Sequence, residues 1–112
     1  MDETDGWTAI AAASELLEGK PIRVGVDDVE VLLVRGGETI FAIGNRCTHQ
    51  GAPLDRGVLK IQGSLATATC PAHGSMFGLL DGRVLRGPAT TPVPAFEARI
   101  ANDMVQVRRR AG

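Results

Sequence analysis

The sequence contains no tyrosine, and among its 112 residues it has only two cysteines, two histidines and one tryptophan. It also lacks an excess of charge, because 12 Lys and Arg residues are balanced by 13 Asp and Glu residues. Proteins that bind nucleic acids or membrane surfaces usually carry a marked basic excess. We therefore expect neither nucleic acid nor a membrane as a partner.

Long hydrophobic runs are also missing, and none approaches the roughly 20 residues that a membrane-spanning helix requires. Residues 1–5 are acidic, and no apolar stretch typical of a secretory signal follows them. We therefore expect a cytoplasmic protein. In that reducing compartment, cysteine thiols remain available to bind metal.

The segments that are present are short runs of β-forming residues separated by Gly, Pro, Asn and Asp. They predict strands over residues 22–26, 29–34, 39–43, 65–69, 76–79, 83–85, 96–101 and 104–108. An alanine-rich stretch, residues 11–18, predicts a short helix or a turn, because Gly19 and Pro21 end it. With no repeat or linker, we expect one all-β domain over residues 1–112, whose base carries a loop-rich insertion at about 44–94.

All the cysteines and histidines lie in two short segments of this insertion, and each segment follows a predicted strand. The four candidate ligands are Cys47, His49, Cys70 and His73. Loops at strand ends are suited to present such side chains from a rigid scaffold. A glycine follows each pair, Gly51 and Gly74, and we expect these glycines to let the backbone approach a bound group closely.

Two Cys and two His can hold either a single tetrahedral zinc ion or an iron–sulfur cluster. Common zinc sites group like ligands, as in C-x-x-C with H-x-x-x-H. Here each segment combines one Cys with one His, first as C-x-H and then as C-x-x-H. This spacing favours the cluster, and a zinc-binding structural module is the alternative.

Residues 47–54 (CTHQGAPL) and 70–77 (CPAHGSMF), with Gly82-Arg83 and Gly87-Pro88-Ala89 after them, resemble the Rieske-type ferredoxins. The resemblance runs through nearly the whole chain. It implies the Rieske iron–sulfur fold, a small antiparallel β base with a loop-rich cluster-binding subdomain. It also implies one [2Fe–2S] cluster, with its inner iron on Cys47 and Cys70 and its outer iron on His49 and His73.

The resemblance also bears on the reduction potential. Two imidazoles in place of two thiolates raise it to about −150 to +300 mV, against about −400 mV for all-cysteine plant-type clusters. High-potential relatives have a tyrosine that donates a hydrogen bond to a ligand sulfur, where this chain has Phe77. Ser75 matches a serine that can donate to a bridging sulfide. We expect a potential in the lower half of the Rieske range.

As a function, the resemblance implies an electron carrier and no catalytic residue. Related oxygenases hold a second, mononuclear iron with two further His and a carboxylate, whereas both His here are already assigned. The expected partners are a flavin-containing NAD(P)H reductase and a terminal Rieske oxygenase, such as an aromatic-ring dioxygenase. The alternative is the small subunit of an assimilatory nitrite reductase, which shares the fold. Partners are expected to dock around the two histidines, with a rim made of Gln50, Pro53, Leu54, Met76 and Pro88.

Overall fold

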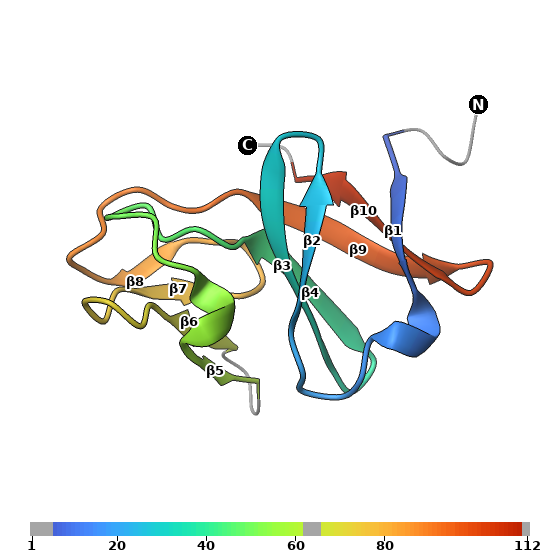
Figure 1. Ribbon diagram of the computed structural model, residues 1–112, viewed down its shortest axis with the longest axis horizontal. Coiled ribbons are helices and arrows are strands. Elements are labelled where there is room, and N and C mark those ends of the chain that lie inside the picture. The colour runs from blue at the N-terminus through green and yellow to red at the C-terminus, as the bar shows by residue number, and fades with distance from the viewer. Residues whose placement is uncertain (1–5, 62–65, 111–112) are drawn as a thin grey trace.

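A computed structural model describes residues 6–61 and 66–110, which form ten strands in two antiparallel sheets (Figure 1). The prediction of an all-β fold is confirmed. The helices in this part of the chain are the short 3-10 helices η1 (Ala13–Glu15) and η2 (Leu54–Arg56). No helix among the described residues is long and apolar enough to cross a membrane.

The larger sheet, which we call the base, has the strand order β1-β10-β9-β4-β3-β2. Its strands are β1 (Thr8–Ala12), β2 (Ile22–Val26), β3 (Val29–Gly36), β4 (Thr39–Gly44), β9 (Ala95–Ala101) and β10 (Met104–Arg109). The smaller sheet has the order β5-β6-β7-β8. Its strands are β5 (Val58–Lys60), β6 (Thr67–Thr69), β7 (Met76–Gly78) and β8 (Val84–Arg86). It belongs to residues 44–94, the ligand-bearing half, which lies at the left of Figure 1.

Tight turns join the base strands as the sequence predicts. β2 and β3 meet at Asp27, which has a positive φ of 54°. β9 and β10 meet at Asn102 and Asp103, with φ values of 55° and 63°. A two-residue hairpin with positive φ at both positions matches the right-handed twist of its strands, and Asn and Asp tolerate that conformation.

Strand β3 separates two hydrophobic cores. Its residues Val31 to Val34 are all fully buried. Side chains alternate between the two faces of a strand, so Val31 and Leu33 enter a core formed by the base strands and the η1 segment. Leu32 and Val34 enter a second core, which the ligand-bearing half completes with Phe77 and other side chains. One strand therefore anchors both parts of the molecule.

Of the two alternatives for residues 11–18, the helix is wrong, and a turn forms only at η1. Ala11 and Ala12 end strand β1 and pair with Val105 and Met104 of β10, and only the η1 turn follows. A stretch of eight residues is too short to be a stable helix by its own propensity. Pairing with β10 and burial of Ala11 decide its structure instead. The predicted strand over residues 65–69 begins at Thr67 in the described residues, which do not include Leu65.

Two glycines allow segments to approach very closely inside this arrangement. A Cβ added to Gly57 would lie 1.8 Å from the carbonyl oxygen of Thr69, between the first ligand loop and β6. A Cβ added to Gly36 would lie 2.2 Å from Cγ2 of Ile61, between the base and the segment after β5. At Gly57 the obstacle is backbone, so this contact requires glycine, whereas a side chain at position 36 would force the Ile61 side chain to move.

Candidate metal centre

Two loops at one end of the molecule carry the four predicted ligands. The first follows β4 and the second joins β6 to β7. Cys47 and Cys70 are buried, with 2% and 4% of their surface exposed, in the core that both parts of the molecule share. His49 and His73 are exposed, and their ring centroids lie 5.2 Å apart with planes at 84°. The structure thus brings the two imidazoles together on the surface and keeps the thiols inside.

The two loops are closed by the same pair of backbone hydrogen bonds. The N–H of Gly51 donates to the carbonyl of Cys47 at 2.7 Å, and the N–H of Gly74 donates to that of Cys70 at 3.2 Å. In each loop the cysteine N–H also donates to the carbonyl of the fifth residue after it, at 2.9 and 2.7 Å. The histidine is the second residue after cysteine in one loop and the third in the other. The two loops therefore have equivalent backbone hydrogen bonds, although the histidine occupies a different position in each.

The two glycines are needed for their backbone conformation. Gly51 and Gly74 have φ values of +81° and +82°, and a Cβ at either would meet no atom within 4 Å. This spacing concerns the protein's own atoms, so the expected close approach of the backbone to a bound group stays a prediction. An L-residue with a side chain is disfavoured by roughly 1–2 kcal/mol in this left-handed region. The repeated hydrogen bonds set that requirement.

A third loop, residues 87–94, joins both ligand loops. The hydroxyl of Thr48 donates to the carbonyl of Thr91 at 2.5 Å. The N–H of Ala89 donates to the hydroxyl oxygen of Ser75 at 3.0 Å. Ser75 is fully buried, and among the described residues its own hydroxyl hydrogen has no protein acceptor. That hydrogen is free to donate to a group bound between the loops.

Asn45 fastens the first loop to the base. This fully buried side chain donates through Nδ2 to Glu30 at 2.7 Å and to Asp55 at 2.8 Å, and its Oδ1 accepts from the Asp55 N–H at 2.8 Å. Its backbone N–H donates to the Glu30 carbonyl, and its carbonyl accepts from Leu54. The sequence alone does not reveal this role of Asn45, because an asparagine beside a loop usually indicates only a turn.

Charged groups complete this fastening. Arg23 of β2 reaches Asp55 at 3.1 Å and Glu30 at 3.2 Å. The hydrogen bond from Asn45 is the largest cause that lowers the pKa of Glu30. Partial burial would raise the pKa of Asp55, but hydrogen bonds from Asn45 and Arg23 outweigh it and lower that pKa. Hydrogen bonding to Asp55 raises the pKa of Arg23. Both carboxyl groups are therefore ionised at neutral pH.

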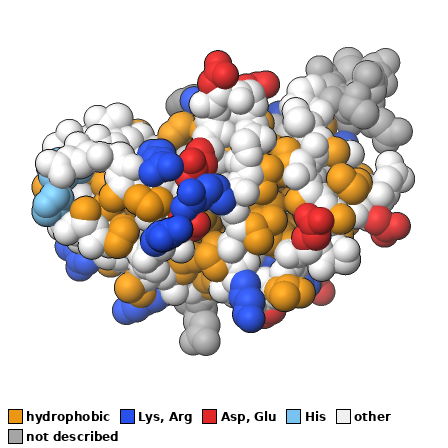
Figure 2. Space-filling view, in the orientation of Figure 1, with side chains coloured by type: hydrophobic (Ala, Val, Ile, Leu, Met, Phe, Trp, Pro, Cys, Tyr) orange, Lys and Arg blue, Asp and Glu red, His pale blue; other side chains and the backbone are white. Residues whose placement is uncertain are grey.

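The histidine end is a convex tip with apolar surroundings, where hydrophobic side chains border the histidine surface (Figure 2). Of the expected rim, Gln50 and Pro88 are exposed, and Pro53 and Met76 are half-buried. Leu54 is fully buried in the shared core, so its assignment to the rim is wrong. Its apolar side chain supports the loop from inside.

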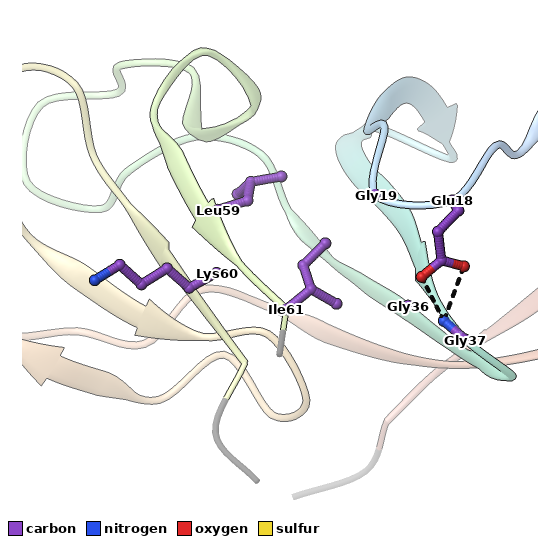
Figure 3. A pocket seen from close by; sticks show the side chains of 7 residues that line it. All are labelled: Glu18, Gly19, Gly36, Gly37, Leu59, Lys60 and Ile61. Carbon is purple, nitrogen blue, oxygen red and sulfur yellow. Dashed lines mark hydrogen bonds between the residues drawn. The ribbon is translucent and has the colours of Figure 1, made fainter. Parts of the chain in front are cut away.

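A groove of about 820 Å³ lies elsewhere, between the β3–β4 hairpin and β5, and none of the four predicted ligands lines it. Figure 3 shows Leu59 and Ile61 pointing across it, whereas Lys60 points away. The Glu18 carboxylate accepts hydrogen bonds from the Gly37 N–H, at 3.0 and 2.9 Å. The groove therefore lies at the boundary between the base and the ligand-bearing half.

The donor set fits a two-iron cluster better than a single ion. Among the described residues, no group of three or more His, Cys, Asp or Glu side chains is arranged to hold one metal ion. A tetrahedral zinc ion would require four. A [2Fe–2S] cluster with two Cys on one iron and two His on the other needs only two donors at each iron. The separation of buried thiols from exposed imidazoles matches that requirement.

Similarities to known sequences agree with a two-iron cluster. A family model described as Rieske [2Fe-2S] domain matches residues 6–97. The 3-phenylpropionate/cinnamic acid dioxygenase ferredoxin subunit of Escherichia coli K12 is 33% identical over 87 residues, 78% of each chain. Apoptosis-inducing factor 3 of Homo sapiens is 32% identical over 89% of this chain, which spans only 16% of that relative.

Solved structures have the same fold. The ferredoxin of carbazole 1,9a-dioxygenase from Nocardioides aromaticivorans IC177 is similar with a TM-score of 0.82 and 30% identity, covering 93% of this chain and 98% of that one. A chain in a complex of reduced oxygenase and oxidized ferredoxin in carbazole 1,9a-dioxygenase is similar with a TM-score of 0.81 and 28% identity. The match covers 96% of this chain and 98% of that one. A structure described as an NADH-dependent nitrite reductase small subunit from Mycobacterium tuberculosis is similar with a TM-score of 0.79 and 32% identity. The match covers 95% of this chain and 96% of that one.

Proposed function

The chain belongs to the Rieske [2Fe-2S] domain family, and from this we propose that it carries single electrons to a terminal oxygenase. The observation that carries the proposal is the pair of exposed imidazoles above a pair of buried thiols. Relatives that the chain matches over most of its length are ferredoxins of dioxygenase systems. They are electron carriers, and catalysis belongs to the oxygenase.

Cys47 and Cys70 would hold the inner iron, and His49 and His73 the outer iron. The bound cluster supplies reversible one-electron chemistry. The protein excludes water from the thiolate side, because both cysteines lie in the shared core. It also fixes the imidazoles by closing both loops with the same hydrogen bonds. Buried thiolates and exposed imidazoles leave the histidine edge as the surface for contact with partners.

The proposed donor is a flavin-containing NAD(P)H reductase, and the proposed acceptor is a terminal Rieske oxygenase, in the cytoplasm. A complex between oxygenase and ferredoxin is known for a relative of similar structure. Because the four ligands expose a single edge, donor and acceptor must use that edge in turn. Contacts of this kind are small and brief, below about 1,200 Å² of buried surface.

Electron paramagnetic resonance of the dithionite-reduced protein tests the cluster assignment, together with iron and sulfide analysis. Two irons and two sulfides per chain with a Rieske-type spectrum support it. Changing His49 to Cys, which keeps a ligand but replaces imidazole by thiolate, should lower the reduction potential. The matched exposed change Gln50→Cys should leave it unaltered. A colourless protein with one zinc ion would contradict the assignment.

Nitrite reduction is the second candidate, because a nitrite reductase small subunit has a similar structure at 32% identity. Deletion of the gene in its host separates the two. Loss of growth on an aromatic carbon source with normal growth on nitrite supports the oxygenase role. Loss of growth on nitrite as nitrogen source would assign the chain to nitrite reductase instead.

A further inference from the structure

The charges of this chain are divided unequally between its two parts. Residues 44–94 contain five Lys or Arg and two Asp or Glu, whereas the rest contains seven and eleven. The ligand-bearing half therefore has a formal charge of +3 and the remainder −4, although the whole chain is close to neutral. In Figure 2 the acidic side chains lie over the middle, the top and the right, away from the histidine end.

The two acidic residues of the ligand-bearing half do not cancel this charge at the tip. Asp55 is bound by Asn45 and Arg23 of the base strand β2. Asp81 lies in the turn before β8, 3.9 Å from Arg83. Neither carboxylate is within ion-pair distance of Arg56 or Arg86.

Basic side chains are tied directly to the ligand loops. Arg86 of β8 is exposed, and its Nε donates at 3.2 Å to the carbonyl of Gly74, the residue after His73. Arg46 makes a similar bond to the carbonyl of Gly51, at 3.3 Å, but also pairs with Glu30. In the part of the chain that the structure describes, neither Arg86 nor Arg56 has an acidic partner. Their charge is therefore available to another molecule.

We propose that the histidine end is a basic docking face, and that it recognises an acidic surface on the protein that accepts the electron. This inference rests on the proposed function and names the chemistry of its partner. Small electron-transfer contacts depend on electrostatic steering for their association rate. The molecule is 41 Å long, several times the screening length of about 8 Å at physiological ionic strength. A partner at the tip therefore meets the local positive charge before the distant negative charge.

The proposal predicts that the rate of oxidation by a small reagent depends on ionic strength in opposite directions for an anionic and a cationic reagent. The reduced holoprotein is mixed with hexacyanoferrate(III) in a stopped-flow instrument, and one electron passes from protein to reagent to give hexacyanoferrate(II). A local positive face predicts that this rate falls as ionic strength rises. The cation tris(phenanthroline)cobalt(III), reduced to cobalt(II), should react faster as ionic strength rises. The opposite dependences would show that the net negative charge governs encounter, and would overturn the proposal.

Charge-removing variants locate the face. Arg56→Gln with Arg86→Gln should slow oxidation by hexacyanoferrate(III) by roughly three- to tenfold at low salt. Lys20→Gln removes the same unit charge from an exposed position in the base and should leave the rate nearly unchanged. The single variant Arg86→Lys keeps the positive charge, so it should be oxidised at the same rate as the natural protein. Reduction potentials are measured for every variant, so that changes in driving force are subtracted. Equal effects of the double variant and of Lys20→Gln would overturn the proposal.

A polymer probe connects the face to a protein surface. Poly-L-glutamate should inhibit oxidation by hexacyanoferrate(III) in the natural protein, and much less in the double variant, whereas poly-L-lysine should not inhibit. Absence of inhibition by poly-L-glutamate would contradict recognition of acidic protein surfaces. These measurements need no physiological partner. If they succeed and gene deletion assigns the chain to nitrite reductase, the docking face stands and the oxygenase role fails.

Discussion

The base and the ligand-bearing half are stabilised in different ways. The base has strands of five to eight residues and a core formed by its own apolar side chains. The ligand-bearing half has four strands of three residues each. Its loops are held by a few hydrogen bonds that involve the side chains of Asn45, Thr48 and Ser75. Short strands bury few residues, so this half depends on neighbours. The difference shows that one part is a scaffold and the other is completed by what it binds.

Loss of the cluster should separate the two parts most strongly. In Cys70→Ser, visible absorption should disappear and residues 44–94 should lose protection from hydrogen exchange, because metal binding and local folding are coupled. Amides in β3, β9 and β10 should remain protected. Cys47→Ser, at the equivalent position of the other loop, should behave in the same way. Unfolding of the entire chain in both variants would mean that the base has no independent stability.

Adjacent leucines in β3 provide a matched comparison. Leu32→Ala and Leu33→Ala should each lower the free energy of unfolding by about 2–5 kcal/mol, the usual cost of a cavity in a core. Leu32 faces the shared core and Leu33 the base core. Only Leu32→Ala should accelerate removal of iron by a chelator under native conditions. Equal acceleration in both variants would show that the two cores respond as one.

Asn45 tests the link between the two parts. Asn45→Ala leaves the Asp55 N–H without its acceptor and removes a hydrogen bond from each of the carboxylates of Glu30 and Asp55, which keep their arginine partners. It should lower the free energy of unfolding by about 1–3 kcal/mol. It should also accelerate iron release, because the first loop loses its attachment to the base. Gln50→Ala, an exposed change in the same loop, should alter stability by less than about 0.5 kcal/mol. Iron release unchanged from the natural protein in Asn45→Ala would show that the cluster alone orders the loop.

The smallest effect should be electronic. Ser75→Ala removes a donor that would stabilise the reduced cluster, so the reduction potential should fall by about 40 mV, equivalent to a hydrogen bond of about 1 kcal/mol. The cluster should remain assembled, and protein-film voltammetry measures the shift. Ser14→Ala, an exposed serine of η1, is the control. An unchanged potential in Ser75→Ala would leave Ser75 with only its structural bond to Ala89.

The base strands were largely predictable because their signals are local. Residues 29–34 form an apolar run beside a turn, and residues 104–108 alternate, so periodicity was sufficient. The helix alternative for residues 11–18 was wrong because a partner distant in the sequence, β10, pairs with Ala11 and Ala12. Strand β5 was missed for the same reason, since Val58–Lys60 is too short to carry a periodic signal.

The candidate ligands could be identified from spacing and resemblance, whereas their supports could not. Nothing local distinguishes the buried Asn45 from a turn asparagine, because its partners Glu30 and Asp55 are 15 and 10 residues away. The matching roles of Gly51 and Gly74 needed φ angles to become visible. The role of the cysteines and histidines as ligands remains a prediction, which the variants above test.

The β9–β10 turn at Asn102 and Asp103 lies at the right end of Figure 1, opposite the ligand loops, on a molecule 41 Å long. An attachment at this turn would therefore lie far from the imidazole edge that partners approach. A linker inserted at the turn could tether the protein to a bead or fuse it to another redox domain without covering the imidazole edge. The position therefore offers an engineering handle for building chains of electron carriers with this domain facing outward.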